Sequence, residues 1–409
     1  MEDQHRTKIK KELLLFFAIV GLFGFSTGMS ENVISNFFFD AYQVTAAQRG
    51  FLEIPREAPG VLAFLAIAFT YKIGDVRLAA VAMLLCAAGM LVLGLLTPSF
   101  AVMAMFIFVH SVGAHLFYPL QESIGMSIIG DQDIGKRMGQ YSAVRTAFML
   151  LASVLIFIGF RAGLFSFMTQ LKLPFVIGAA GYAVTFVLFA VLFVKFKVSG
   201  EARKKEFKII IKKRYTLFYI LAVLTGVHRQ IMLVYGPWVL IETLGRQADT
   251  LALLIIISSL LGAFLLPVFG RCIDRFGTKK LLLVEGFVFI ALYVVFGFMS
   301  SAFANGSLAH TGLPVIIICG LIVIDRLGTN TNIVRAVYLR SIVTDPADIT
   351  PTLSTGFSMD HVVSITCAFM GGVVWYRYGS QYVFYAAALL SVINVVVAVM
   401  IKPAKPSAT

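Results

Sequence analysis

The chain has 409 residues, of which 59% are hydrophobic and only 13% are charged, and its formal net charge is +13 at pH 7. Soluble domains carry about 25% charged residues, so a deficit along the whole chain excludes a soluble protein and indicates an integral membrane protein. A basic excess can also mark nucleic-acid binding, but the placement of these charges excludes that class, as described below.

Apolar segments of membrane-spanning length follow one another along the chain. A spanning helix needs about 20 mostly apolar residues. The sequence predicts twelve such spans: 13–38, 50–71, 78–97, 100–123, 138–160, 173–195, 215–241, 250–270, 281–300, 313–339, 353–376 and 380–401. The first is too long for a signal-peptide core and lacks a small-residue cleavage site. The predicted fold is therefore an all-α integral membrane protein with twelve transmembrane helices.

Most Lys and Arg residues fall on one side of this map, including the amino terminus, the linker 196–214, the loop 271–280 and the carboxy-terminal tail. The opposite loops carry only Arg49, Arg161, Lys172, Arg246 and Arg377. Cytoplasmic loops are enriched in Lys and Arg, so we expect both termini and the linker to face the cytoplasm. The basic excess then reflects topology and attraction to anionic lipid.

The basic linker 196–214 divides the chain into two six-span bundles, residues 1–195 and 215–409. Related stretches occur at corresponding loops of the two halves: SIIGDQDIG at Ser127–Gly135 and SIVTDPADIT at Ser341–Thr350. Two pseudo-symmetric halves with a substrate site near the membrane midplane are a common plan for transporters.

The second span opens with GFLEIPREAPG, which places charged residues where lipid-facing ones are expected. Glu53, Arg56 and Glu57 are spaced i, i+3 and i+4, so we expect one helical face to present all three. One interpretation is an ion-pair cluster with Glu31 that joins the first two spans at an outer gate. The other is that one carboxylate is a proton or substrate site, because two acids sharing one arginine leave one acid poorly neutralised.

A second group of polar residues is predicted near the membrane midplane. An ionised group there costs about 2.5–3.5 kcal/mol on insertion scales, so such residues are expected to face a cavity or a partner. We expect this group to bind the solute or the coupling ion: His110, His115, His228, Arg229, Asp325 and Arg326. For His228 a packing role is the alternative, and the spacing of the two histidines on the fourth span does not favour a metal site.

A third group is predicted nearer the cytoplasm and is expected to form the ion pairs of an inner gate, with solute contacts as the alternative: Glu122, Arg145, Arg335, Asp360 and His361. Glu285 is alone on the ninth span and is expected to be structural. The four cysteines have neither metal-ligand spacing nor the pattern of a disulfide framework.

The loop GRCIDRFGTKK, Gly270–Lys280, resembles the loop signature of the major facilitator superfamily, Gly-x-x-x-Asp-Arg-x-Gly-x-(Arg/Lys)-(Arg/Lys). The first-half copy departs from the signature, since Tyr71 and Lys72 replace Asp-Arg. The resemblance implies that spans one, four, seven and ten line a central cavity. It also implies that Asp274 caps a neighbouring helix while Arg275 pairs nearby. The other matching positions are Gly277, Lys279 and Lys280.

These observations predict a secondary active transporter, not an enzyme, that works by alternating access. No Walker-type phosphate loop is present, and titratable side chains within spans suit proton coupling, with sodium left open. Arginines favour an anionic organic solute, while the acids and histidines that balance them make a zwitterion fit almost as well. We expect a monomer in the plasma (inner) membrane, with solute and lipid as partners and with no nucleic acid, metal or organic cofactor.

Two other functions were weighed against this one. A proton-driven drug or metabolite efflux antiporter usually carries a glycine-proline signature late in the fifth span, and the sequence AFMLLASVLIFIGFRAG has no proline there. An intramembrane lipid-modifying enzyme would need a nucleophile or metal set, and neither GxSxG nor HExxH occurs.

Overall fold

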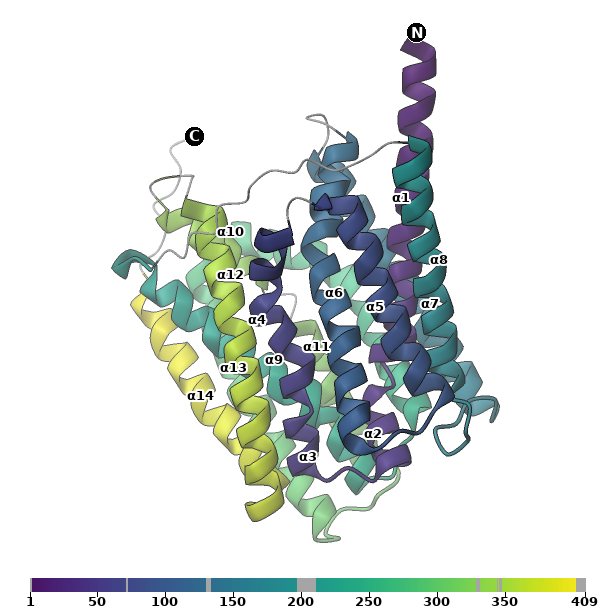
Figure 1. Cartoon of the computed structure of the whole chain (residues 1–409). Coiled ribbons are helices and arrows are strands. Elements are labelled where there is room, and N and C mark those ends of the chain that lie inside the picture. The colour runs from purple at the N-terminus through teal and green to yellow at the C-terminus, as the bar shows by residue number, and fades with distance from the viewer. Residues whose placement is uncertain are drawn as a thin grey trace. The chain divides into compact units, whose positions relative to one another are not determined.

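A computed structural model of the chain describes residues 2–70, 73–129, 134–196, 211–328, 332–343, 345 and 348–401 (Figure 1). Within these ranges the regular elements are helices and no strand occurs, which confirms the all-α prediction. Most of the predicted linker 196–214, part of the Ser127–Gly135 repeat and the tail beyond residue 401 lie outside the described residues.

The helices fall into two compact units. Unit 1 comprises Met1–Gln43, Pro55–Phe207 and Gln247–Leu253. Its helices are α1 (Glu2–Glu31), α2 (Ile34–Tyr42), α4 (Glu53–Thr70), α5 (Asp75–Leu95), α6 (Phe100–Ile129), α7 (Ile134–Arg161) and α8 (Leu173–Phe196). Within this unit α5 packs against α6 and α8, and α1 packs against α7 and α8.

Glycines on α1 let it approach α7 closely. A Cβ at Gly24 would lie 2.5 Å from the backbone oxygen of Arg145, and one at Gly28 would lie 2.7 Å from Cβ of Ala152. Small residues at helix interfaces permit such close packing inside a membrane. The contact fixes the end of α1, where Glu31 lies.

Unit 2 comprises Val44–Ile54, Lys208–Arg246 and Leu254–Thr409. Its helices are α3 (Ala46–Phe51), α9 (Thr216–Trp238), α10 (Ala248–Ala304, in this unit from Leu254), α11 (Leu313–Gly328), α12 (Asn332–Ile342), α13 (Ile349–Tyr378) and α14 (Ser380–Met400). A short 3-10 turn, Lys213–Tyr215, precedes α9, and a π-helical turn, Val239–Thr243, extends it. Helix α13 packs against α3, α9 and α14.

The short helix α3 belongs to unit 2, although it precedes α4 in the first half of the chain. Thr45 begins it with a capping box, in which Thr45 and Gln48 bind each other's backbone amides. A Cβ at Gly50 would lie 2.3 Å from the backbone oxygen of Ala368 on α13. Only glycine allows this approach. The contact with α13 therefore helps to hold residues 44–54 in unit 2, although this segment lies in the first half of the sequence.

Helix α10 runs through the predicted loop between the eighth and ninth spans. Its helical geometry is interrupted at Gly277, where φ is 78° and ψ is 162°. This left-handed backbone region suits glycine because it has no Cβ. The family signature therefore marks a kink between two helical segments, where the sequence predicts a loop.

Nine helical segments among the described residues are long and apolar enough to cross a membrane. One of them, Ala248–Ala304, covers both the eighth and the ninth predicted span. The second predicted span coincides with α4 and the tenth with α11 and α12, and these are not among the nine. The chain is thus a multi-pass membrane protein whose helices are consistent with twelve crossings.

Candidate functional site

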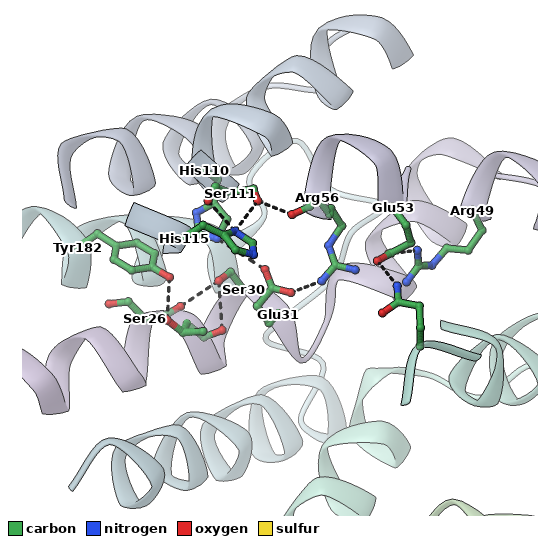
Figure 2. Close-up of polar contacts among 12 residues, drawn as sticks. Ser26, Ser30, Glu31, Arg49, Glu53, Arg56, His110, Ser111, His115 and Tyr182 are labelled. Atoms are coloured by element: carbon green, nitrogen blue, oxygen red, sulfur yellow. Dashed lines mark hydrogen bonds and ion pairs between the residues drawn. The ribbon is translucent and has the colours of Figure 1, made fainter. Parts of the chain in front are cut away.

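Unit 1 gathers a polar cluster around Glu31, the last residue of α1 (Figure 2). Nη2 of Arg56, on α4, donates to Oε2 of Glu31, and Nε2 of His110, on α6, lies 3.6 Å from Oε1. The side chain of Glu31 is 34% exposed, whereas that of Arg56 is 12% exposed and that of His110 is 4% exposed. One carboxylate therefore bridges a permanent cation and a titratable imidazole.

The second predicted histidine of this span is tied into the same cluster. Ser111 Oγ donates to the backbone oxygen of Arg56 and lies 3.0 Å from Nδ1 of His115. The same nitrogen lies 2.9 Å from the backbone oxygen of Ser111. Arg56 is thus held at both its backbone and its guanidinium, which fixes the direction in which it reaches Glu31.

The position of His110 depends on two glycines that bring α5 and α6 together. A Cβ at Gly89 would lie 2.7 Å from Cβ of His110, and one at Gly113 would lie 2.4 Å from the backbone oxygen of Ala82. Two weak bonds then join His110 to Cys86. His110 Nδ1 lies 3.4 Å from the Cys86 backbone oxygen, and Cys86 Sγ donates to the His110 backbone oxygen at 3.5 Å.

The charges of GFLEIPREAPG have different ion-pair partners. Glu53 pairs with Arg49 one turn earlier and accepts a hydrogen bond from Nε2 of Gln230 at 2.8 Å, whereas Arg56 pairs with Glu31 (Figure 2). Arg49, predicted to lie in a loop, is 1% exposed. Glu57 is half-buried on α4.

In unit 2, Arg229 of α9 and Asp360 of α13 form an ion pair. Nη2 of Arg229 lies 2.5 Å from Oδ2 of Asp360 and 3.4 Å from Oγ of Ser364. The two charged side chains are 34% and 14% exposed. Gly226, one turn before Arg229, leaves room for the carboxylate, since a Cβ there would lie 2.1 Å from Oδ1 of Asp360.

A chain of hydrogen bonds links the neighbouring His228 to Asp325. The hydroxyl of Tyr293 has one hydrogen and lies within hydrogen-bond distance of two acceptors, Oδ1 of Asp325 at 3.0 Å and the backbone oxygen of His228 at 3.3 Å. Nε2 of His228 lies 2.9 Å from Oγ of Ser391. Ser391 Oγ also lies 2.9 Å from the backbone oxygen of Ala387, an acceptor that competes with His228 for its single hydrogen.

This network favours the tautomer of His228 in which Nε2 donates to Ser391. In that tautomer Nδ1 of the neutral ring carries a lone pair. His228 is 2% exposed, and its Nδ1 has no hydrogen-bond partner among the described residues. An acceptor nitrogen is therefore buried without a donor, an arrangement that costs free energy unless a ligand or water supplies one.

A small pocket in unit 2 brings several of these side chains to one surface. It is lined by Thr225, His228, Arg229, Glu285, Phe289, Asp325 and Gly328. Three of the predicted solute-binding or coupling residues thus meet there, namely His228, Arg229 and Asp325. A fourth, Arg326, is half-buried on α11 beside Asp325.

Two of the residues predicted for an inner gate form ion pairs with residues outside that group. Nη2 of Arg335 donates to Oε1 of Glu285 at 2.7 Å, and both side chains are nearly fully buried. Arg335 thus pairs with Glu285, the acid expected to be structural, and Asp360 pairs with Arg229 of the group predicted near the midplane. Depth counted along a helix does not reveal which face of the helix a side chain occupies, so it does not identify partners.

The other predicted gate residues lie elsewhere. Glu122 is exposed on α6. The guanidinium carbon of Arg145 lies 5.9 Å from the centroid of the Tyr118 ring, a contact of the cation–π type. His361 is 6% exposed, and its ring lies 5.2 Å from that of Phe357.

The family signature lies on α10 near its kink. Asp274 is exposed and forms no hydrogen bond with a described residue, so the helix cap implied by the resemblance stays a prediction. Arg275 lies over the ring of the next residue, Phe276, at 5.3 Å. Lys279 Nζ donates to the backbone oxygen of Val399 at 2.6 Å, which joins α10 to α14. Gly270 and Lys280 lie on the same helix.

The sequence did not indicate several residues of these clusters, because neutral side chains carry little signal in an apolar span. They are Ser111, Gln230, Tyr293 and Ser391. Arg49 had a usable signal, since it precedes Glu53 by four residues, the spacing of helical ion pairs.

Comparison with known proteins gives a family match over most of the chain. Residues 13–339 match the family model described as the Major Facilitator Superfamily. The chain belongs to the Major Facilitator Superfamily. Membership makes it a secondary transporter by class. No curated protein matches the sequence.

Solved transporters of this superfamily share its fold at low sequence identity. A mutant of the nucleoside transporter NupG is 15% identical with a TM-score of 0.76, covering 95% of this chain and 99% of NupG. The D-xylose–proton symporter is 15% identical with a TM-score of 0.68, covering 97% and 98%. A mutant of the peptide transporter POT is 13% identical with a TM-score of 0.72, covering 95% and 94%. These similarities establish the fold only.

Proposed function

We propose that this major facilitator transporter is a proton-coupled symporter of a small anionic or zwitterionic organic solute and works by alternating access. The observation that carries the proposal is the unit 2 pocket, where His228, Arg229 and Asp325 meet. These side chains offer an unpaired acceptor, a guanidinium and a carboxylate. Together they suit a solute that carries both an acid group and a hydrogen-bond donor.

Arg229 is the proposed contact for the acid group. A guanidinium matches carboxylate and phosphate in a bidentate manner. Its present partner is Asp360, and the Arg229 side chain keeps 34% of its surface exposed. A solute carboxylate can therefore approach this cation, and the amino group of a zwitterion would suit the acid beside it.

Nδ1 of His228 is the proposed contact for the donor. In the tautomer with Nε2 donating to Ser391, Nδ1 carries a lone pair, and no described residue bonds to it. An N–H or O–H of the solute would supply the missing bond. This requirement favours amino acids and hydroxy acids over simple carboxylates, which lack a donor.

Proton coupling is the proposed energy source. Ionisable side chains inside spans mark ion pathways in many transporters, and here Asp325 and His228 lie in one network with Tyr293. One structural neighbour is named a D-xylose–proton symporter, which supports the proposal by analogy of fold. We also propose that the protein is a monomer of the plasma membrane. Both termini should be cytoplasmic, because its basic loops follow the positive-inside pattern.

The test begins with thermal unfolding of the purified protein in the presence of carboxylates, phosphates, amino acids and lipophilic cations at pH 5.5 and 7.5. A ligand that binds the folded state alone raises its melting temperature. Hits are then assayed for uptake into proteoliposomes with an inside-alkaline gradient. We expect an acid bearing an N–H or O–H to stabilise wild type but not Arg229→Ala, and to accumulate with the gradient. Stabilisation by lipophilic cations alone would contradict the proposal and favour an efflux antiporter.

A further inference from the structure

Two of the acids at the unit 2 pocket already have a cationic partner. Nη2 of Arg229 lies 2.5 Å from Oδ2 of Asp360. Nη2 of Arg335 donates to Oε1 of Glu285 at 2.7 Å, and Glu285 lines the pocket. A cationic group of a solute would therefore have to compete with a guanidinium at either carboxylate.

Asp325, the other acid that lines the pocket, has different surroundings. It is 4% exposed and forms no ion pair with a described residue. The hydroxyl of Tyr293 lies 3.0 Å from Oδ1, and no described residue donates to Oδ2. The charge of the adjacent Arg326 acts on this carboxylate, but Arg326 does not line the pocket. A buried carboxylate without a paired cation is costly in its charged form, so the pocket favours a positive group at Asp325.

A second acceptor of the same pocket is Nδ1 of His228. In the tautomer with Nε2 donating to Ser391, this nitrogen carries a lone pair, and no described residue bonds to it. His228 is 2% exposed and lines the pocket together with Asp325. The pocket thus presents two buried acceptors, and each of them is stabilised by a hydrogen that the solute supplies.

The number of hydrogens distinguishes the solute groups that could meet both acceptors. A hydroxyl has one hydrogen, so it can donate to only one of the two. A primary ammonium has three hydrogens, no lone pair and a positive charge. A quaternary ammonium has the charge but no hydrogen to donate. Of these three groups, only the primary ammonium supplies both hydrogen bonds and the compensating charge.

We infer that Asp325 and Nδ1 of His228 form an ammonium subsite in the solute pocket, and that the solute is an amino acid and not a hydroxy acid. Arg229 then holds the carboxylate of the solute, while Asp325 and His228 hold its ammonium group. The inference rests on the proposed function for the acid contact at Arg229, whereas the preference for an ammonium can be tested at Asp325 alone.

The first experiment measures the affinities of purified wild type for matched ligands by isothermal titration calorimetry at pH 7.5. Each set shares one carbon skeleton and differs in one group, as in alanine, lactate and N,N,N-trimethylalanine, with equivalent sets built on phenylalanine and on 4-aminobutyrate. We expect the amino acid to bind about 10- to 100-fold more tightly than its two analogues, the scale of a hydrogen bond to a charged group. Equal or tighter binding of the hydroxy acid or of the trimethyl compound would overturn the inference.

The second experiment repeats these titrations in Asp325→Asn, which keeps the shape of the side chain and removes its charge. We expect the affinity for the amino acid to fall about tenfold or more, while that for the hydroxy acid stays similar. Asp249→Asn is the matched control, because Asp249 pairs with Arg161 outside the pocket, and it should change neither affinity. Melting temperatures without ligand show whether each variant is folded, and the wild-type titrations decide the inference if Asp325→Asn is not. An unchanged preference for the amino acid in folded Asp325→Asn would contradict the assignment.

Failure of the proposed function would give a different result. Acids that bind Arg229→Ala as tightly as wild type would refute the acid contact. In that case propylamine, which has no acid group, still tests the subsite, and its binding to wild type but not to Asp325→Asn would support it. Acids that depend on Arg229 but show no preference for an ammonium would refute the inference and leave the proposed function in place. Binding of none of these compounds would refute both.

Discussion

Nη2 of Arg229 lies 2.5 Å from Oδ2 of Asp360, so a pair of opposite charges joins α9 to α13 within one unit. The pair is only partly buried, and Arg229 also lines the pocket that holds His228 and Asp325. A contact of this kind can stabilise the helices at rest and exchange one partner for a charged solute during transport.

Replacement of Arg229 by alanine should weaken solute binding about 10- to 100-fold. A hydrogen bond to a charged group contributes about 1.5–3 kcal/mol, and each 1.4 kcal/mol is about tenfold in affinity. The measurement is solute Kd by thermal shift or calorimetry. The matched control is Arg161→Ala, which removes an ion pair with Asp249 whose arginine is 75% exposed and should change neither binding nor stability. Equal affinities of Arg229→Ala and wild type would remove this arginine from the site.

Removal of one partner of the Arg49–Glu53 pair should reduce stability strongly, whereas replacement of both partners by apolar residues should change stability little. Both side chains are almost fully buried, and removal of one partner leaves an uncompensated charge, which typically costs about 3–5 kcal/mol. Glu53→Leu should therefore destabilise unit 2 strongly, and the double variant Arg49→Met/Glu53→Leu should recover most of that loss. Unfolding in detergent, followed by intrinsic fluorescence, measures both. A double variant less stable than the single one would show that the pair itself stabilises the fold.

Gly50→Ala should displace α3 from α13. Its Cβ would lie 2.3 Å from the backbone oxygen of Ala368 and 2.8 Å from the hydroxyl of Tyr235, and overpacking of this kind typically costs about 1–3 kcal/mol. Gly139→Ala on α7 is the control, since nothing lies within 4 Å of a Cβ there and alanine favours a helix by about 0.5–1 kcal/mol. We expect the melting temperature to fall in Gly50→Ala and to rise in Gly139→Ala. A neutral or stabilising Gly50→Ala would show that the α3 contact is loose.

Asp348 and Lys212 should make stability depend on pH at both ends of the scale. Nζ of Lys212 lies 2.5 Å from Oδ2 of Asp348, and the hydroxyl of Tyr215 donates to the same oxygen at 2.7 Å. The bond from Lys212, followed by that from Tyr215, holds the pKa of Asp348 below its usual value near 3.8, and the same bond to Asp348 raises the pKa of Lys212 above 10.5.

The lowered pKa of Asp348 and the raised pKa of Lys212 determine how stability changes with pH. Stabilisation by the carboxylate is fully present above its ordinary pKa and is lost as pH falls through its lowered value, whereas stabilisation by the ammonium is lost as pH rises through its raised value. Wild type should therefore exceed Asp348→Asn in melting temperature at neutral pH, with the difference shrinking in strong acid. A difference that stays constant down to pH 2 would contradict the ionic nature of the contact.

The helices were predictable from sequence because apolar length is a direct physical requirement of the bilayer, and every predicted span overlaps one or two α-helices. The site was only partly predictable. Residues such as Arg229 and Asp325 are conspicuous because a charge inside a span is costly. Their partners depend on how each helix is rotated about its axis and on how closely two helices approach each other. Glycines such as Gly89 and Gly113 determine this approach, and the composition of a span does not reveal it. Pairing of Glu53 with Arg49 shows the limit, since spacing allowed both this partner and Arg56.

The lack of a side chain at Gly226 affects how the solute specificity of the pocket can change by mutation. Because a Cβ there would lie 2.1 Å from Oδ1 of Asp360, any larger residue must push the carboxylate aside and with it the guanidinium of Arg229. A single substitution at residue 226, which no solute touches, would then move the charged groups at the pocket without changing which residues line it. Selection for a new cargo in the laboratory should accordingly recover substitutions at residue 226 as readily as at the charged positions themselves.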